Sequence, residues 1–179
     1  GPVDDISWSV AARQLIFGTD GAELSLRASG DEEILTPTNA NVRPFSTQGS
    51  AKSIAAKLDT SVVFVQRGGQ RIMEALFGDY NYQSVDLTTF YPEAGDSPIT
   101  HIAIQRQPDT RIHCVREDGN VSILLHDKAE DISCSVKRTG GFVEDVVVLP
   151  GTTGGEDDVY YLVKRTVNSS TVCYLEKWV

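Results

Sequence analysis

Four turn-forming pairs, spaced almost evenly along the chain, constrain its fold more than any other feature. Asp118-Gly119 lies between two short apolar runs, Ile112–Val115 and Val121–Leu125. Such a pair is the strongest short-range signal for a tight primed hairpin turn, because Gly tolerates positive φ and Asp adopts it at low cost. The pattern occurs four times, with turn centres about 48 to 50 residues apart. The predicted turn residues are Asp20, Gly21, Gly68, Gly69, Asp118, Gly119, Asn168 and Ser169.

This spacing divides the 179 residues into four approximate repeats, 3–49, 50–98, 99–142 and 143–179. Each repeat has an opening strand, a hairpin and a more variable outer strand. Roughly 50 residues for four short strands is the proportion of a β-propeller blade. We therefore predict an all-β, β-propeller-like fold, with about four blades of short antiparallel strands in a single domain spanning 1–179. The blades form an open arc or part of a larger ring, and a β-sandwich, which uses the same local pattern, is the alternative.

Three segments carry more local expectations. Residues 50–58 allow a short helix, although the matching position in the other repeats is a strand, which we favour. The run Val146–Leu149 predicts a strand buried on both faces. Alternation in 23–27 places Leu24 and Leu26 on one face and the polar residues on the other. The predicted core residues are Phe64, Ile102, Ile104, Ile112, Val115, Ile123, Leu125, Val146 and Val148.

The charge of the chain is strongly acidic, with a net charge of -9 and a sequence pI near 4.7. Repulsion from phosphates argues against a dedicated nucleic-acid surface. No apolar run approaches the roughly 20 residues of a membrane span, and no signal peptide is visible. Gly1-Pro2 is typical of the scar left when an expression tag is removed.

Histidines and cysteines offer little chemistry. Cys114, Cys134 and Cys173 form no Cys-x-x-Cys pair, and we expect reduced thiols in strands. His113 is next to Cys114, but neighbours on a strand point to opposite faces. His101 could approach His113 across paired strands, yet no third ligand is evident. We predict no metal site, no cofactor and no catalytic residue.

Two acidic clusters fall on predicted loop tips, where propellers carry their binding functions. The first comprises Asp31, Glu32 and Glu33, and the second comprises Glu156, Asp157 and Asp158. Their spacing lacks the interleaved pattern of a dedicated calcium loop, so solvated tips that contact a partner are favoured over calcium sites.

Several segments together resemble the nozzle (tail tubular) proteins of short-tailed bacteriophages and prophages. The most specific are LTPTN…QGS at 35–50, FVQRGG at 64–69, QPDTRIHCVREDG at 107–119 and VKRTVN…LEKW at 163–178. The likeness runs over nearly the whole chain, which is shorter than a full nozzle protein.

The resemblance implies a viral protein: a virion structural component from the β-propeller region of a nozzle at the end of the tail tube. It implies no enzymatic activity. The expected partners are the tail adaptor and other nozzle subunits in a homo-oligomeric ring, with transient passage of DNA during genome ejection and no membrane insertion. The expected location is the virion tail, after synthesis in the host bacterial cytoplasm. The alternative is a β-propeller module that binds a host receptor or glycan through its loops, and a propeller hydrolase would need carboxylates gathered at one mouth.

Overall fold

The computed structural model describes residues 4–30, 34–52, 55–126, 132–152 and 154–179. Within these ranges the chain contains strands and one short 3-10 helix, η1 (Pro92–Gly95), but no α-helix. Gly1-Pro2 and the acidic cluster at 31–33 lie outside the described residues. The all-β prediction is confirmed, and the sheets are open and antiparallel, of propeller-like or sandwich type.

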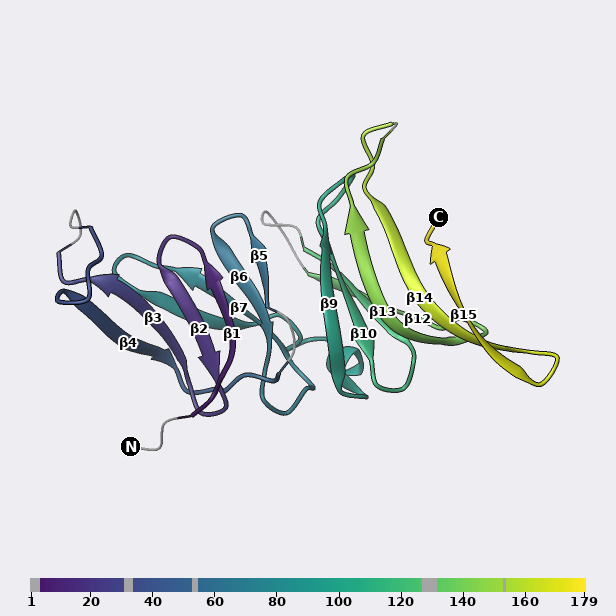
Figure 1. Ribbon diagram of the computed structural model, residues 1–179, viewed down its shortest axis with the longest axis horizontal. Helices are drawn as coiled ribbons and strands as arrows, with labels where there is room; N and C mark the ends of the chain where they lie inside the picture. Colours follow the sequence, from purple (N-terminus) through teal and green to yellow (C-terminus); the bar gives the residue numbers. More distant parts are fainter. Residues whose placement is uncertain (1–3, 31–33, 53–54, 127–131, 153) are drawn as a thin grey trace. The chain divides into compact units, whose positions relative to one another are not determined.

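The strands form four sheets in chain order, and each strand pairs only with its neighbours in sequence (Figure 1). The first sheet has β1 (Ile6–Ala11), β2 (Leu15–Thr19), β3 (Glu23–Ala28) and β4 (Ala40–Ser46). The second has β5 (Ala56–Leu58), β6 (Ser61–Val65), β7 (Ile72–Phe77) and β8 (Tyr82–Asp86). The third has β9 (Ile99–Gln105), β10 (Arg111–Arg116), β11 (Val121–Leu125) and β12 (Ser133–Lys137). The fourth has three strands, β13 (Phe142–Leu149), β14 (Asp158–Val167) and β15 (Ser170–Lys177).

The chain divides into two compact units, Gly1–Leu87 and Thr88–Val179, and each unit holds two sheets. The first three sheets fall within the segments 3–49, 50–98 and 99–142, and the fourth begins at Phe142, one residue before the segment 143–179. The segment 50–58 contains β5 and the isolated bridge from Ser50 to Gln66, so the strand that we favoured there is present in place of a helix. That all four repeats form a single domain stays a prediction.

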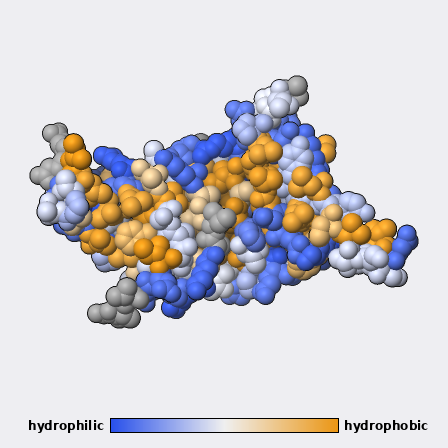
Figure 2. Space-filling model, in the orientation of Figure 1, coloured by the Kyte–Doolittle hydropathy of each residue, from blue (hydrophilic) through white to orange (hydrophobic). Residues whose placement is uncertain are grey.

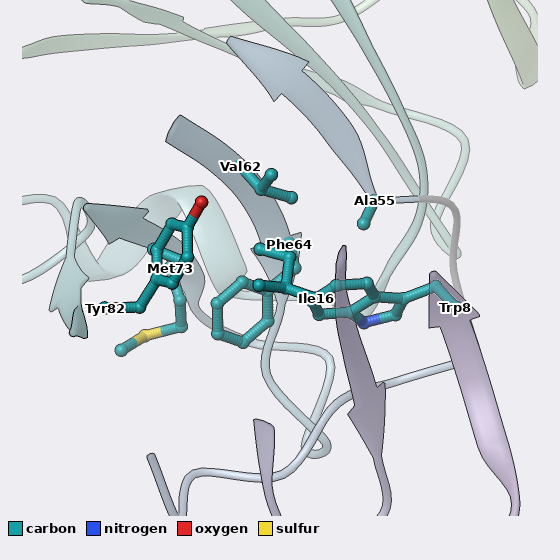
Figure 3. Packing of buried hydrophobic residues seen from close by; sticks show 8 residues of the cluster. Trp8, Ile16, Ala55, Val62, Phe64, Met73 and Tyr82 are labelled. Carbon is teal, nitrogen blue, oxygen red and sulfur yellow. The ribbon is translucent and has the colours of Figure 1, made fainter. Parts of the chain in front are cut away.

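In the first unit, the two sheets share one apolar core (Figure 3). Phe64 of β6 is fully buried, and its ring centroid lies 5.3 Å from that of Trp8 in β1. Ile16 of β2 packs in the same layer, with Met73 of β7 and Tyr82 of β8 on the side of the second sheet. Burying this layer removes from water the faces that neither sheet could cover alone.

The second unit repeats the design with smaller side chains. Val115, Val121 and Ile123 of the third sheet pack with Val143 and Val163 of the fourth. Tyr161 and Val159 complete the layer, with Val146, Val148 and Trp178 packed against it. All nine predicted core residues are buried or half-buried, the half-buried ones being Ile104, Leu125, Val146 and Val148.

Two of the local expectations are only partly right, because neighbouring sheets decide which face is covered. β13 is not buried on both faces: Val147 is 44% exposed and Leu149 48% exposed. One face of β13 packs on the third sheet, and the other is open to solvent. In β3 the alternation is present, but Glu23 and Ser25 are buried while Leu24 and Leu26 are only half-buried. On the face drawn in Figure 2, apolar and hydrophilic patches lie side by side on the surface.

The predicted turn residues all connect paired strands, but only one of the four turns is the two-residue primed turn that we expected. Asn168 and Ser169 both have positive φ, 48° and 63°, between the paired residues Val167 and Ser170. In the central hairpin, three residues separate Arg116 from Asn120, whose carbonyl accepts a hydrogen bond from the Arg116 amide. Such a loop needs a left-handed residue at its end, which Gly119 supplies with φ +78°.

The other two turns also depart from the primed form. Four residues separate Gln66 from Arg71, and Gly69 takes the left-handed position with φ +75°. Asp20 and Gly21 form a two-residue loop without positive φ. There the Thr19 hydroxyl accepts a hydrogen bond from the amide of Ala22. This side-chain hydrogen bond stabilises the loop without the positive φ angles of a primed turn.

The two glycines of the second and third hairpins give a matched test of the turn geometry. We expect Gly119→Ala to lower the free energy of unfolding of the second unit by about 2–4 kcal/mol, because it combines a left-handed backbone with a crowded site. A Cβ at Gly119 would lie 2.4 Å from the Phe142 ring, whereas one at Gly68 meets nothing within 4 Å. Gly68→Ala should therefore change stability by less than about 1 kcal/mol. Urea denaturation of both variants measures the difference, and equal effects would contradict the geometry.

Candidate binding cleft in the first unit

A cleft of about 390 Å³ opens where three connections of the first unit come together. Its walls come from the β1–β2 turn, from the end of β3 with the segment that follows, and from the β7–β8 turn. Because turns of an antiparallel meander alternate between its two ends, the β1–β2 and β3–β4 connections share one end of the first sheet. The lining side chains that carry charge or a large apolar group include Arg13, Arg27, Leu35, Phe77, Asp79 and Tyr80.

Tyr82 holds in place the β1–β2 turn, which forms one wall of the cleft. Its hydroxyl oxygen accepts hydrogen bonds from the amides of Arg13 and Gln14, at 3.2 and 3.4 Å. The Tyr82 ring is buried and meets Phe77 edge-on at 5.1 Å and Phe45 at 5.5 Å. The second sheet therefore holds the β1–β2 turn of the first sheet in place, so the position of Arg13 is set by core packing.

The cleft offers three kinds of contact to a ligand. The Arg13 guanidinium carbon lies 4.4 Å from the centroid of the Phe77 ring, in cation–π geometry. Stacking uses the face of the guanidinium and leaves the N–H groups at its edge available. Tyr80 is 86% exposed and presents an aromatic ring, and the exposed carboxylate of Asp79 can accept hydrogen bonds. Arg27 adds a second positive charge, although it already has an interaction within the chain.

A second, smaller hollow of about 280 Å³ lies in the second unit between Arg111, Trp178 and β12. The Arg111 guanidinium carbon is 5.3 Å from the Trp178 ring centroid. However, Arg111 also forms an ion pair with Asp109 at 2.9 Å. Since its charge is already compensated, this hollow is a weaker candidate than the cleft of the first unit.

In the second acidic cluster, Glu156–Asp158, the two aspartates form hydrogen bonds and an ion pair within the second unit. Asp157 accepts hydrogen bonds from the amides of Arg106 and Gln107, at 2.7 and 3.0 Å. Asp158 pairs with Lys177 at 2.7 Å. Glu156 is exposed, as expected of a solvated tip, whereas both aspartates are half-buried. Among the described residues, no group of three or more His, Cys, Asp or Glu side chains could hold a metal ion.

His113, the one histidine next to a cysteine, joins the two sheets of the second unit. Its Nδ1 lies 2.6 Å from the Tyr161 hydroxyl of β14, and its Nε2 lies 3.1 Å from Gln105 Oε1 of β9. Burial, and then the charge of Arg111, lower the pKa of His113 to about 4. A neutral ring that donates to Gln105 and accepts from Tyr161 satisfies both nitrogens. His101 is paired with Val115 and not with His113, so the two rings are not opposite each other.

The cysteines have no reactive surroundings. Cys114, Cys134 and Cys173 are free thiols, as expected. Burial raises the pKa of Cys114 well above its usual range, with a further contribution from Cys134. Burial likewise raises the pKa of Cys134 to about 11, with the Glu93 carboxylate adding to the rise. Such thiols stay protonated near neutral pH and are poor nucleophiles.

No protein-family model matches the chain, and no curated protein matches it at a significant level. No helix among the described residues is long and apolar enough to cross a membrane. The function of the cleft therefore has to be argued from its own residues. Sequence reasoning missed these residues, although an aromatic residue inside the turn-forming run Gly78-Asp79-Tyr80-Asn81 was a signal that could have drawn attention to Tyr80.

The buried histidine gives a pH prediction with a definite sign. The folded pKa of His113 is about 4, below its ordinary value of 6.5, so the unfolded chain binds more protons between these values. Stability from this site is fully present above pH 6.5 and is lost as the pH falls towards 4, by about 3 kcal/mol in all. We expect the difference in free energy of unfolding between the wild type and His113→Gln to decrease by this amount as the pH is lowered from 7 to 4, as measured by urea denaturation. A gap independent of pH would contradict the account.

Proposed function

We propose that this chain is a non-enzymatic structural module of the tail of a short-tailed bacteriophage, belonging to the nozzle. The observation that carries the proposal is the succession of meander sheets, one in each repeat, in a chain whose segments resemble nozzle proteins along nearly its whole length. Its partners are the tail adaptor and other nozzle subunits in a homo-oligomeric ring. The module is made in the host bacterial cytoplasm and acts in the virion tail.

The proposed mechanism is mechanical. Within each unit the two sheets share an apolar core, and close-packed cores deform little under load. The loops at the sheet ends are then held in fixed positions, from which they contact neighbouring subunits. A rigid wall of this kind suits a conduit through which a genome leaves.

The net charge of -9 supports the same proposal. A polyanion that passes an acidic surface is repelled, so a duplex in transit does not adhere to it. The wall of a conduit needs this property, whereas a protein that grips DNA needs the opposite charge.

One observation favours a second candidate function, the binding of a host surface glycan. The cleft combines an exposed aromatic ring, a guanidinium group and a carboxylate at one end of the first unit. Small-molecule sites are typically concave, with an apolar lining and a few convergent polar groups. This function is compatible with a place in a tail, because surface loops and the core are separate parts of the fold.

The position in the virion can be tested directly. We expect an antibody raised against this chain to label the distal end of the tail on short-tailed particles produced by a bacterium that carries the gene. Immunogold electron microscopy makes the measurement, with an antibody against a capsid protein as the control. Particles labelled by the control antibody alone would refute the tail assignment.

The charge argument makes a separate prediction. We expect the protein to show no salt-dependent binding to a short DNA duplex near physiological ionic strength, because its net charge of -9 repels the phosphates. Fluorescence anisotropy with a labelled duplex measures this, with a basic peptide as the positive control. Binding that weakens steeply with added salt would show that the wall attracts DNA.

A further inference from the structure

We propose that the cleft of the first unit binds a short saccharide that carries a carboxylate group. This inference deepens the second candidate function and rests on it, and it does not depend on the tail assignment. Three features carry it: a preorganised arginine, an exposed aromatic ring, and a carboxylate that accepts hydrogen bonds. They come from two different sheets and meet only in the folded unit.

The size of the cleft suits a small molecule. Its volume of about 390 Å³ lies in the lower part of the range of roughly 300–1,000 Å³ that small-ligand sites occupy. It is open on one side, as a site must be if it binds part of a chain whose remainder extends into solvent. A short run of sugar units fits this description better than a compact metabolite, which is normally enclosed.

Tyr80 supplies the apolar platform. The ring is 86% exposed in the β7–β8 turn, and leaving such a large side chain in water gains nothing for folding. Each pyranose ring has a face of C–H groups that matches the flat face of an aromatic ring. Leu35 is also exposed in the wall and extends this apolar contact.

Arg13 selects for the carboxylate. The planar guanidinium group matches a carboxylate with two parallel hydrogen bonds. Among the described residues, no carboxylate pairs with Arg13, and its side chain contacts the Phe77 ring. Its backbone is fixed by the Tyr82 hydroxyl, so less conformational freedom is lost when a ligand binds.

Asp79 sets an upper limit on the charge of the ligand. Its carboxylate can accept hydrogen bonds from sugar hydroxyls, but it repels a second anionic group close by. A densely charged ligand such as a nucleic acid would also meet the net charge of -9. Among the described lining residues, Arg13 and Asp79 together therefore fit a saccharide with isolated carboxylates among many hydroxyls.

The test compares two saccharides that differ only in the group at C6. We expect an α-1,4-linked galactose trisaccharide in which one unit is galacturonate to shift the amide NMR signals of Arg13, Asp79 and Tyr80 and to bind at least tenfold more tightly than α-1,4-galactotriose. Arg13→Gln should remove this preference. Tyr80→Ala should weaken the binding of both saccharides at least fivefold, because each loses the aromatic platform.

The controls are an aromatic residue and an arginine outside the cleft. Phe90 has the same exposed fraction as Tyr80, 86%, so Phe90→Ala should leave binding unchanged, as should Arg138→Gln. Signals far from each substitution show whether a variant is folded.

The proposal is overturned if neither saccharide shifts the cleft signals at about 10 mM, which corresponds to a binding free energy weaker than about -3 kcal/mol. Equal affinity for the two saccharides, or affinity unchanged in both cleft variants, overturns it as well. None of these results bears on the labelling of virions, so the two proposals fail separately.

Discussion

An open sheet of three or four short strands cannot bury both of its faces, so every other feature of this protein depends on how neighbouring sheets cover each other. In both units the contact is made by an apolar layer and by one recurring backbone hydrogen bond. The Ser50 amide donates to the Thr19 carbonyl at 2.8 Å, and the Val143 amide donates to the Gly119 carbonyl at 3.0 Å. In each case the opening segment of one sheet is bonded to a hairpin turn of the sheet before it. The turns therefore connect strands and also fix the distance between sheets.

This double role explains why small residues occur at these junctions. Gly49 has φ +73°, and a Cβ there would lie 2.2 Å from the carbonyl oxygen of Asp20. At Gly119, a Cβ would instead meet the side chain of Phe142, at 2.4 Å. A side chain at either position would separate the hairpin turn from the next sheet. The glycines are thus required by the packing between sheets as much as by turn geometry.

Buried polar groups add specificity to these apolar layers. The hydroxyl of Ser50 donates to the carboxylate of Glu23 at 2.8 Å, and Tyr161 bonds to His113 across the second unit. Each pair joins two sheets of one unit, so a shift of one sheet along the other would leave a buried polar atom without its partner. Apolar packing alone tolerates such shifts more readily.

The sequence predicted what depends on local residues and failed where a distant segment decides. Strand positions, hairpin turns and the core side chains could be predicted, because alternation and turn chemistry act over a few residues. The buried face of β3 could not be predicted, since the buried Glu23 accepts a hydrogen bond from Ser50, which belongs to another segment of the chain. It also could not be predicted that only one face of β13 is covered, because the run of valines does not indicate how many sheets pack against this strand. The cleft was missed for the same reason: Arg13 and Tyr80 are far apart in sequence, and the buried Tyr82 brings their turns together.

The separation between core and cleft has a physical consequence for the two proposed functions. The shared apolar layers and the bonds between sheets hold each unit together, and most of the side chains that line the cleft are exposed or only partly buried. Exposed side chains contribute little to stability, so changes at Arg13 or Tyr80 should affect the proposed binding site without lowering the stability of the unit. Tyr82 is the exception, because it belongs to the core and also bonds to the β1–β2 turn. A structural module can thus acquire a binding site on its loops at little cost in rigidity, and the wall of a conduit and a saccharide site can exist in the same chain.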